Sequence, residues 1–410
     1  MKKAILGILA ALAVFSAHAQ APVDKYLNET LENSDSSVPE LKPLDERIDS
    51  FLRAWNIRGA SLAVTRNDSL VYAKGYGWAD KEKGERMRPG HTMRLASVSK
   101  LITAIGIMVL QEEGRLNLQS PVFGPFGILE GYDDLITEDN YYAITVEHLL
   151  RHQAGFTTAY GDPLFSTRKV MRQFGLKSKP TMEEMIRCQI TLPLDAEPGT
   201  ATEYSNFGYL LLSAIIEKAS GMSYEDFIQE KVLRKAGCME FHIAGNYLSD
   251  RVEGEVKYYP PDDSGEISDV SGSGRMVSRC YGGNDVTGSS GAGAWAGSSV
   301  ELARLIAAID GLYQRPDILM PFTTMQMGRY INDDTFALGW LTSTPEGELT
   351  RTGSFSGTNA LVKYYPDGEC WILITNTSTW KGTRLARETQ PLLSTLRRDY
   401  GKYLPRRDLF

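Results

Sequence analysis

The segment Ser97-Val98-Ser99-Lys100 places a lysine three residues after a serine, so the amine could act as a base for the hydroxyl. A serine hydroxyl becomes an effective nucleophile when a base lies nearby and donors stabilise the oxyanion formed by its attack on a carbonyl. The same spacing recurs at residues 166–169 and 378–381. The pattern alone therefore identifies no nucleophile, and the flanking residues must decide among the three serines.

Ser97 and Lys100 begin the segment 97–113, which is apolar on nearly every face and predicts a buried helix ending at Gly114. On a helix, positions i and i+3 share a face, and the first-turn N–H groups lie at the positive end of the dipole. Burial also lowers the pKa of a lysine. Taken alone, residues 97–100 fit a helix cap with a lysine that reaches solvent as well as they fit a nucleophile with its base.

The other two pairs have surroundings typical of surface lysines. Ser166 and Lys169 lie in the polar stretch LFSTRKVMRQF, and Ser378 and Lys381 lie in a turn before a glycine. No G-x-S-x-G elbow, the signature of α/β-hydrolases, occurs in the chain. These comparisons favour Ser97 as the nucleophile and Lys100 as its base.

A zinc site is the competing interpretation of the histidines. His148 and His152 have the i, i+4 spacing of zinc ligands, but Leu149 stands where a zinc hydrolase helix would carry glutamate. Packing at a helix end is therefore the better interpretation, and we expect no metal and no organic cofactor.

Composition limits the possible partners. The 410 residues are 42% apolar and 23% charged, and a formal net charge of −7 argues against a nucleic-acid or anionic-membrane partner. Four widely spaced cysteines, at positions 188, 238, 280 and 370, permit three full disulfide pairings that the sequence does not rank. Buried free thiols are at least as good an interpretation of each.

The N-terminus has the pattern of a secretory signal. Lys2 and Lys3 precede an apolar run over residues 4–15, and small residues at 17 and 19 suit cleavage after Ala19. We therefore expect a periplasmic or secreted protein with no transmembrane segment after cleavage. Residues 20–41 are polar and acidic, and they are interpreted as a flexible leader.

The remaining chain predicts one domain over residues 42–400. Helices are expected at about 44–55 and 205–221, over 302–312 after a capping box at Ser298–Glu301, and last in the chain a helix that ends near Tyr400. A hairpin is expected around Asn67-Asp68, and β-like runs are expected at 336–344 and 361–378. Residues 42–118 and 290–400 would form one sheet region, with a helical and loop insert over 119–289. Loops rich in Gly, Ser, Asp and Pro are expected from about 245 to 293.

Three motifs in order carry a family resemblance. Ser-x-x-Lys at 97–100, Tyr-Ser-Asn at 204–206 and Arg-Thr-Gly at 351–353 resemble the set of the serine β-lactamase and penicillin-binding protein superfamily. The tyrosine and the flanking text, HLLRHQAGF and PGTATEYSNFGYLLL, are similar to its class C β-lactamase, DD-peptidase and esterase branch. The likeness covers residues 45–400. It implies an α+β, β-lactamase/transpeptidase-like fold: an antiparallel sheet from the N- and C-terminal segments, flanked by helices, with an inserted mainly helical region.

The resemblance also implies roles for individual residues. Ser97 would attack the carbonyl and form an acyl-enzyme, while Lys100 and Tyr204 would share the proton transfers. Asn206 would orient Lys100 and the substrate amide. Simpler structural roles remain open for two of them: Tyr204 could be a core tyrosine and Asn206 a helix cap.

The third motif would bind the substrate. Thr352 and Gly353 would lie on a strand edge that pairs with an extended substrate, and the N–H groups of Ser97 and Ser354 would form the oxyanion hole. Arg351 departs from the lysine or histidine usual in the family. It could hold a substrate carboxylate with two hydrogen bonds, but it cannot exchange a proton near neutral pH. A surface ion pair is the alternative role for Arg351.

The expected function is that of an exported serine hydrolase acting through an acyl-enzyme. Its small-molecule or peptide substrates would be D-amino-acid peptides such as peptidoglycan stem peptides, as for a DD-carboxypeptidase, or β-lactams or esters. The alternatives are a promiscuous carboxylesterase and a non-catalytic module that binds penicillin or a peptide. The sequence leaves open the natural substrate, the acyl acceptor and the oligomeric state.

Overall fold

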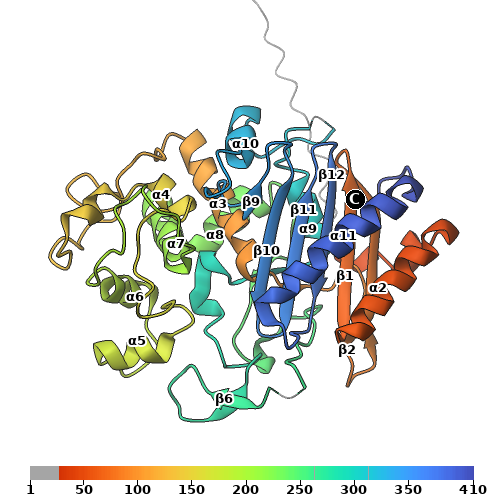
Figure 1. Cartoon of the computed structure of the whole chain (residues 1–410), viewed down its shortest axis with the longest axis horizontal. Coiled ribbons are helices and arrows are strands. Elements are labelled where there is room, and N and C mark those ends of the chain that lie inside the picture. Colours follow the sequence, from red (N-terminus) through yellow and green to blue (C-terminus); the bar gives the residue numbers. More distant parts are fainter. Residues whose placement is uncertain (1–26, 263, 313) are drawn as a thin grey trace, which may run out of the picture.

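A seven-stranded antiparallel sheet is the centre of the computed structural model, which describes residues 27–262, 264–312 and 314–410 (Figure 1). The strand order is β3-β2-β1-β12-β11-β10-β9, so N-terminal and C-terminal strands meet where β1 pairs with β12. This arrangement confirms the expected fold. The strands are β1 (Gly59–Arg66), β2 (Ser69–Asp80), β3 (Glu85–Arg86), β9 (Thr342–Ser343), β10 (Leu349–Phe355), β11 (Thr358–Tyr364) and β12 (Glu369–Thr375).

The predicted hairpin joins β1 to β2 through a two-residue turn. Asn67 and Asp68 have φ angles of 47° and 63°, so both adopt the left-handed conformation that a type I′ turn requires. Asparagine and aspartate tolerate this conformation better than most residues. The hairpin at this position is therefore confirmed.

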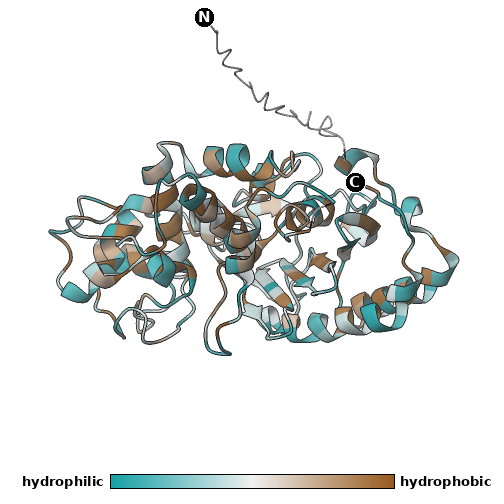
Figure 2. Cartoon of the chain, turned by 90° about the horizontal axis from the view of Figure 1, so that it is seen from above, coloured by the Kyte–Doolittle hydropathy of each residue, from teal (hydrophilic) through white to brown (hydrophobic). Residues whose placement is uncertain are grey.

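Helices cover both faces of the sheet, because side chains alternate along each strand. On β1, Leu62 and Val64 pack with α2 (Lys42–Ala54) and α11 (Ala386–Tyr400), while Ala63 faces the opposite cluster. That opposite face is covered by α9 (Ser299–Ile306). In Figure 2, hydrophobic ribbon gathers in the interior, and the outer turns of the helices are largely hydrophilic.

Helix α3 (Ser99–Glu112) links the sheet to the insert. All residues from Ser99 to Leu110 are buried, as the apolar sequence predicts, and α3 packs against α7 (Asn206–Ser220). Gly114, at φ 68°, follows its end. The insert lies to one side of the sheet in Figure 1. Its other helices are α4 (Val146–Leu150), α5 (Thr167–Phe174), α6 (Met182–Gln189) and α8 (Tyr224–Ile228), which continues into a π-helical turn, η5 (Gln229–Leu233).

The expected flexible leader differs from the structure over its described part. Residues 27–41 form α1 (Leu27–Thr30) and two 3-10 turns, η1 (Asn33–Ser36) and η2 (Pro39–Leu41), with Leu27, Leu31 and Leu41 buried. The side chains of Asn33 and Ser36 accept hydrogen bonds from backbone N–H groups of β2. These polar side chains bind N–H groups on the part of the β2 edge that does not pair with β3. The predicted signal lies outside the described residues.

Smaller expectations also need correction. Of the β-like run 336–344, only β9 is a strand, and α10 (Pro321–Gly328) was not expected. Ser298 caps α9, but the Glu301 carboxylate accepts from the N–H groups of Met239 and Glu240 and closes no capping box.

The expected loop region contains one short hairpin, β6 (Glu266–Ser268) with β7 (Met276–Ser278). A second small sheet joins β4 (Met93–Arg94), β8 (Trp295–Gly297) and β5 (His242–Ile243). The four cysteines are buried free thiols.

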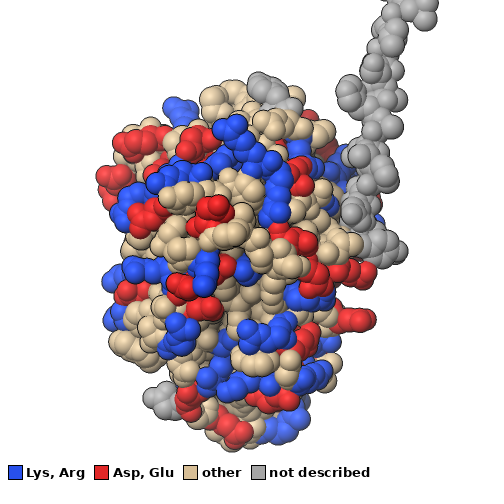
Figure 3. All heavy atoms as spheres, turned by 90° about the vertical axis from the view of Figure 1, so that its right-hand side faces the viewer, with Lys and Arg blue, Asp and Glu red and all other residues tan. Residues whose placement is uncertain are grey.

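Surface charge and helix length bear on the expected partners. The face in Figure 3 carries acidic and basic side chains interspersed, without a broad field of one sign. Within the described ranges, no helix has both the length and the apolarity needed to span a bilayer.

Candidate active site

Ser97 lies in a 3-10 turn, η3 (Ala96–Val98), immediately before α3. The helix itself starts two residues later than the sequence predicted. Ala96 has a φ angle of 48°, a strained conformation for a residue with a Cβ atom, and such strain persists only where packing enforces it. The turn brings the Ser97 hydroxyl to the junction of α3, α7 and β10.

Lys100 is fully buried, and its Nζ contacts three acceptors. It is 3.2 Å from Ser97 Oγ, 2.5 Å from Asn206 Oδ1 and 2.6 Å from the carbonyl oxygen of Ala292. Burial lowers the pKa of Lys100; Tyr204 acts in the opposite direction, and the charge of Arg351 lowers the pKa further. The amine is therefore held against the hydroxyl in a setting that favours its neutral, basic form.

The phenol of Tyr204 approaches the same hydroxyl. Its oxygen is 2.8 Å from Ser97 Oγ and 3.3 Å from Arg351 Nη2. Burial alone would raise the pKa of Tyr204, but the charges of Lys100 and Arg351 outweigh it, and the net shift is downward. The face of the ring stacks on His152 with the centroids 4.4 Å apart. A phenol held in this way loses its own proton more readily than an ordinary tyrosine, and the resulting phenolate could take the proton of Ser97.

Asn206 is held by an acidic residue that the sequence analysis missed. Its Oδ1 accepts from Lys100, and its Nδ2 donates to the carboxylate of Asp162. That carboxylate also accepts from the N–H of Leu164. Ser205 caps α7 by accepting from the N–H of Gly208, which leaves the Asn206 side chain free for the site. The only sequence signal for Asp162 is a Gly-Asp-Pro turn, which indicates no partner.

Arg351 lies behind the nucleophile and not in the wall of the cleft. It is 1% exposed; its Nε donates to the carbonyl oxygen of Ser97 at 2.8 Å, and its Nη2 donates to Tyr204. Its Nη1 is buried with no hydrogen-bond partner. The alternative of a surface ion pair is therefore wrong. This placement puts the guanidinium in contact with Ser97 and Tyr204 and gives it no access to a carboxylate in the cleft.

The rest of the third motif forms one wall of a cleft of 350 Å³ in front of Ser97. Thr352, Gly353 and Ser354 line it together with Tyr204. A Cβ atom on Gly353 would lie 2.1 Å from the carbonyl oxygen of Leu95 and 2.9 Å from the Ser97 nitrogen, so only glycine permits this approach. In the described chain β9 pairs only with the first two residues of β10, which leaves Thr352–Phe355 without a strand on that side.

The rejected serines have no lysine partner. Lys169 Nζ donates to the carbonyl of Tyr160, and Lys381 pairs with Glu388. Ser378 Oγ bonds two backbone groups of the turn between β10 and β11. Of the three Ser-x-x-Lys segments, only residues 97–100 bring hydroxyl and amine together.

The two histidines of the alternative zinc site point to different partners. His148 Nδ1 accepts from the N–H of Thr145 at the start of α4, and His152 Nδ1 accepts from the N–H of Ser205. Burial, followed by the charges of Arg351 and Lys100, holds the pKa of His152 well below its usual range. Among the described residues, no cluster of three or more histidine, cysteine or acidic side chains is arranged to hold a metal ion.

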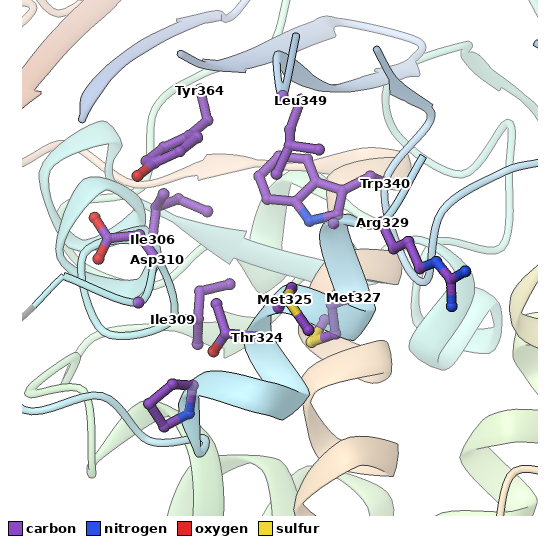
Figure 4. A pocket seen from close by; sticks show the side chains of 14 residues that line it. Ile306, Ile309, Asp310, Thr324, Met325, Met327, Arg329, Trp340, Leu349 and Tyr364 are labelled. Carbon is purple, nitrogen blue, oxygen red and sulfur yellow. The ribbon is translucent and has the colours of Figure 1, made fainter. Parts of the chain in front are cut away.

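The α10 cavity, of 560 Å³, lies apart from the motif residues and from the cleft. It is enclosed by α9, α10 and the ends of β10 and β11, with Met327, Trp340 and Tyr364 in its walls (Figure 4). None of the predicted site residues lines it. Although this cavity is larger than the cleft at Ser97, none of its walls comes from the three motifs, so we assign it no part in the chemistry.

Comparison with known proteins agrees with this geometry. The family model described as Beta-lactamase matches residues 44–393. Penicillin-binding protein 4* of Bacillus subtilis (strain 168) is 31% identical over 210 residues, which are 51% of this chain and 43% of that protein. Esterase EstB of Burkholderia gladioli is 29% identical over 202 residues, 47% and 49% of the two chains. The matched part of the chain thus spans about half the length of these relatives.

Solved structures show the same fold. The octameric penicillin-binding protein homologue from Pyrococcus abyssi aligns with a TM-score of 0.65 at 23% identity, covering 87% of this chain and 77% of that one. The D-amino acid amidase from Ochrobactrum anthropi SV3 aligns with a TM-score of 0.66 at 20% identity, covering 87% and 99%. Since the family model covers most of the chain and the fold agrees, the protein belongs to the Beta-lactamase family, whose members include serine hydrolases.

Proposed function

We propose that this protein is an exported serine hydrolase that forms an acyl-enzyme at Ser97. The observation that carries the proposal is the convergence of two basic groups on one hydroxyl: Tyr204 at 2.8 Å and Lys100 at 3.2 Å. Both distances are within the reach of direct proton transfer. Neither an isolated helix cap nor a core tyrosine would require this arrangement.

The chemistry follows from these positions. Ser97 Oγ attacks the substrate carbonyl while the Tyr204–Lys100 pair takes its proton, and the carbonyl oxygen becomes an oxyanion that the N–H groups of Ser97 and Ser354 would stabilise. Collapse breaks the bond to the leaving group, which receives the proton, and leaves an ester on Ser97. Water then attacks the ester with the same pair as base, which releases the acid and restores the hydroxyl.

The substrate would be an amide or ester of a D-amino-acid peptide. The free edge of β10 beside the nucleophile supports an extended substrate that pairs through its backbone. The names of the relatives, a penicillin-binding protein, an esterase and a D-amino acid amidase, support the same range of acyl donors. A peptide ending in D-alanine fits this range.

Active-site labelling tests the proposal. Wild-type protein should react with both a fluorescent penicillin and a fluorophosphonate, and Ser97→Ala should abolish both signals, whereas Ser166→Ala should abolish neither. Labelling that survives Ser97→Ala would refute the assignment. Penicillin labelling that never turns over would support a non-catalytic binding module, and labelling by the fluorophosphonate alone would support a carboxylesterase.

A further inference from the structure

The catalytic cleft continues into a second cavity, also of 560 Å³, which is distinct from the α10 cavity. The two spaces share three wall residues, Phe165, Ser354 and Thr383. Phe165 packs against Phe355 with the ring centroids 5.4 Å apart and the ring planes tilted by 49°, and this pair marks the passage between the two spaces. A substrate longer than the 350 Å³ cleft would therefore extend past the aromatic pair into the second cavity.

The charge on the described walls of the cleft and the second cavity is positive. No described aspartate or glutamate lines either space, and Arg279 is the one lysine or arginine that does. Arg279 is exposed, and its Nε donates to the carbonyl of Ser264 at 3.3 Å, while no described carboxylate lies within ion-pair distance of it. Among the described residues, a backbone carbonyl orients the guanidinium and no carboxylate compensates its charge.

The rest of the second cavity suits a polar chain with some apolar surface. Asn284, Ser356 and Thr379 line it, and Trp380, 75% exposed, lies at its wall. Arg351, the other arginine near the site, is buried against Ser97 and Tyr204 and faces neither cavity. Of the described residues that line the two spaces, Arg279 is therefore the one that can meet a charged group on an extended substrate.

We propose that Arg279 determines specificity by binding a carboxylate that the substrate carries beyond the aromatic pair, away from the scissile bond. The proposal rests on the function proposed above and names its substrate class: extended acyl donors, such as peptides, with an acidic side chain remote from the reacting carbonyl. Arginine suits this role because its planar fork matches a carboxylate.

Binding to Ser97→Ala protein tests the proposal separately from turnover. The probes are dansylated pentapeptides ending in D-alanine, with glutamate or glutamine at the second, third or fourth residue from the C-terminus. At one position the glutamate peptide should bind about three- to tenfold more tightly than its glutamine counterpart, as for a partly exposed ion pair with an oriented arginine. Adding Arg279→Gln should abolish the preference, Arg279→Glu should reverse it, and Arg279→Lys should keep part of it.

Arg168→Gln is the matched control. Arg168 is also exposed and also donates to a backbone carbonyl, that of Ser268, but it lines neither cavity. Equal binding of glutamate and glutamine peptides at every position, or a preference that survives Arg279→Gln, would overturn the proposal. Hydrolysis of the same peptides by wild-type protein tests the proposed function, so binding preference without turnover would refute only that function.

Discussion

Replacing Asp162 by asparagine tests how the base at Lys100 is oriented. The Asp162 carboxylate accepts from Asn206 Nδ2, which turns Asn206 Oδ1 toward Lys100 Nζ. Asparagine has the same shape and still accepts from the N–H of Leu164 through its Oδ1. Its own amide would then face the Nδ2 of Asn206, donor against donor, and Asn206 would rotate to direct a donor at Lys100.

The magnitude follows from the hydrogen bond that is lost. A hydrogen bond to a charged partner contributes about 1.5–3 kcal/mol, which corresponds to a decrease in kcat of roughly ten- to hundredfold. The charge of Asp162 also raises the pKa of Lys100 against the larger lowering effect of burial. Losing that charge lowers the pKa of Lys100 further, and because the neutral amine is the proposed base, the acidic limb of the rate profile should move to lower pH.

The assay measures kcat and KM for an ester of a D-amino acid between pH 5 and 10. Asp195→Asn is the control, because its carboxylate accepts from the N–H of Thr158 in the same loop region and contacts no catalytic group. A structural loosening of the loop would lower kcat without moving the limb. Wild-type kcat with an unmoved limb in Asp162→Asn would refute the positioning role.

Three further changes have distinct expected results. Gly353→Ala puts a methyl group 2.1 Å from a backbone carbonyl and should lower kcat/KM at least tenfold and the Tm by several degrees, whereas Gly208→Ala, with its nearest neighbour at 3.7 Å, should leave kcat/KM within about twofold. Arg351→Gln removes a cation that lowers the pKa of Tyr204, so kcat should fall about ten- to hundredfold with KM changed less than threefold; a rise in KM alone would indicate that it binds substrate. Burial and neighbouring carboxylates raise the pKa of Asp310 to about 8, so its contribution to stability is full at low pH and is lost as pH rises from about 4 to 8. Asparagine at position 310 stays neutral at every pH. Thermal denaturation should therefore show that the Tm difference, Asp310→Asn minus wild type, is about 1–3 °C larger at pH 8 than at pH 5. Equal Tm differences at the two pH values would contradict the assignment.

The features predicted correctly from residue patterns alone, without the family resemblance, depend on neighbours in the chain. Ser97 and Lys100 meet because they are three residues apart at a helix start, and the hairpin at Asn67 follows from residues that tolerate a positive φ. The helices α3 and α7 follow from long apolar runs ending at glycine. In each case the physical cause lies within one turn or one hairpin of the effect.

The features that were missed depend on contacts between distant segments. Asp162 reaches Asn206 across 44 positions, and nothing near Asp162 in the chain indicates that contact. The segment 27–41 looks like a leader by composition, yet its side chains complete an edge of β2. The family resemblance implied a substrate carboxylate as the partner of Arg351, and the motif itself does not indicate which side of the strand this side chain faces. Because successive side chains of β10 point to opposite sides, the neighbouring position in the strand would face the cleft, whereas Arg351 faces the backbone of Ser97.

The facing of Arg351 has a consequence for the pH dependence of the whole site. A guanidinium cannot lose its proton near neutral pH, so the charge beside Tyr204 is constant. The charge of Tyr204 raises the pKa of Lys100, and the charge of Lys100 lowers the pKa of Tyr204. Both groups contact the same hydroxyl. The proton exchanged with Ser97 therefore belongs to the Lys100–Tyr204 pair, and the rate profile should report values of the pair and not of either residue. A lysine at position 351 would add a third titrating group, so the arginine confines the pH response to two.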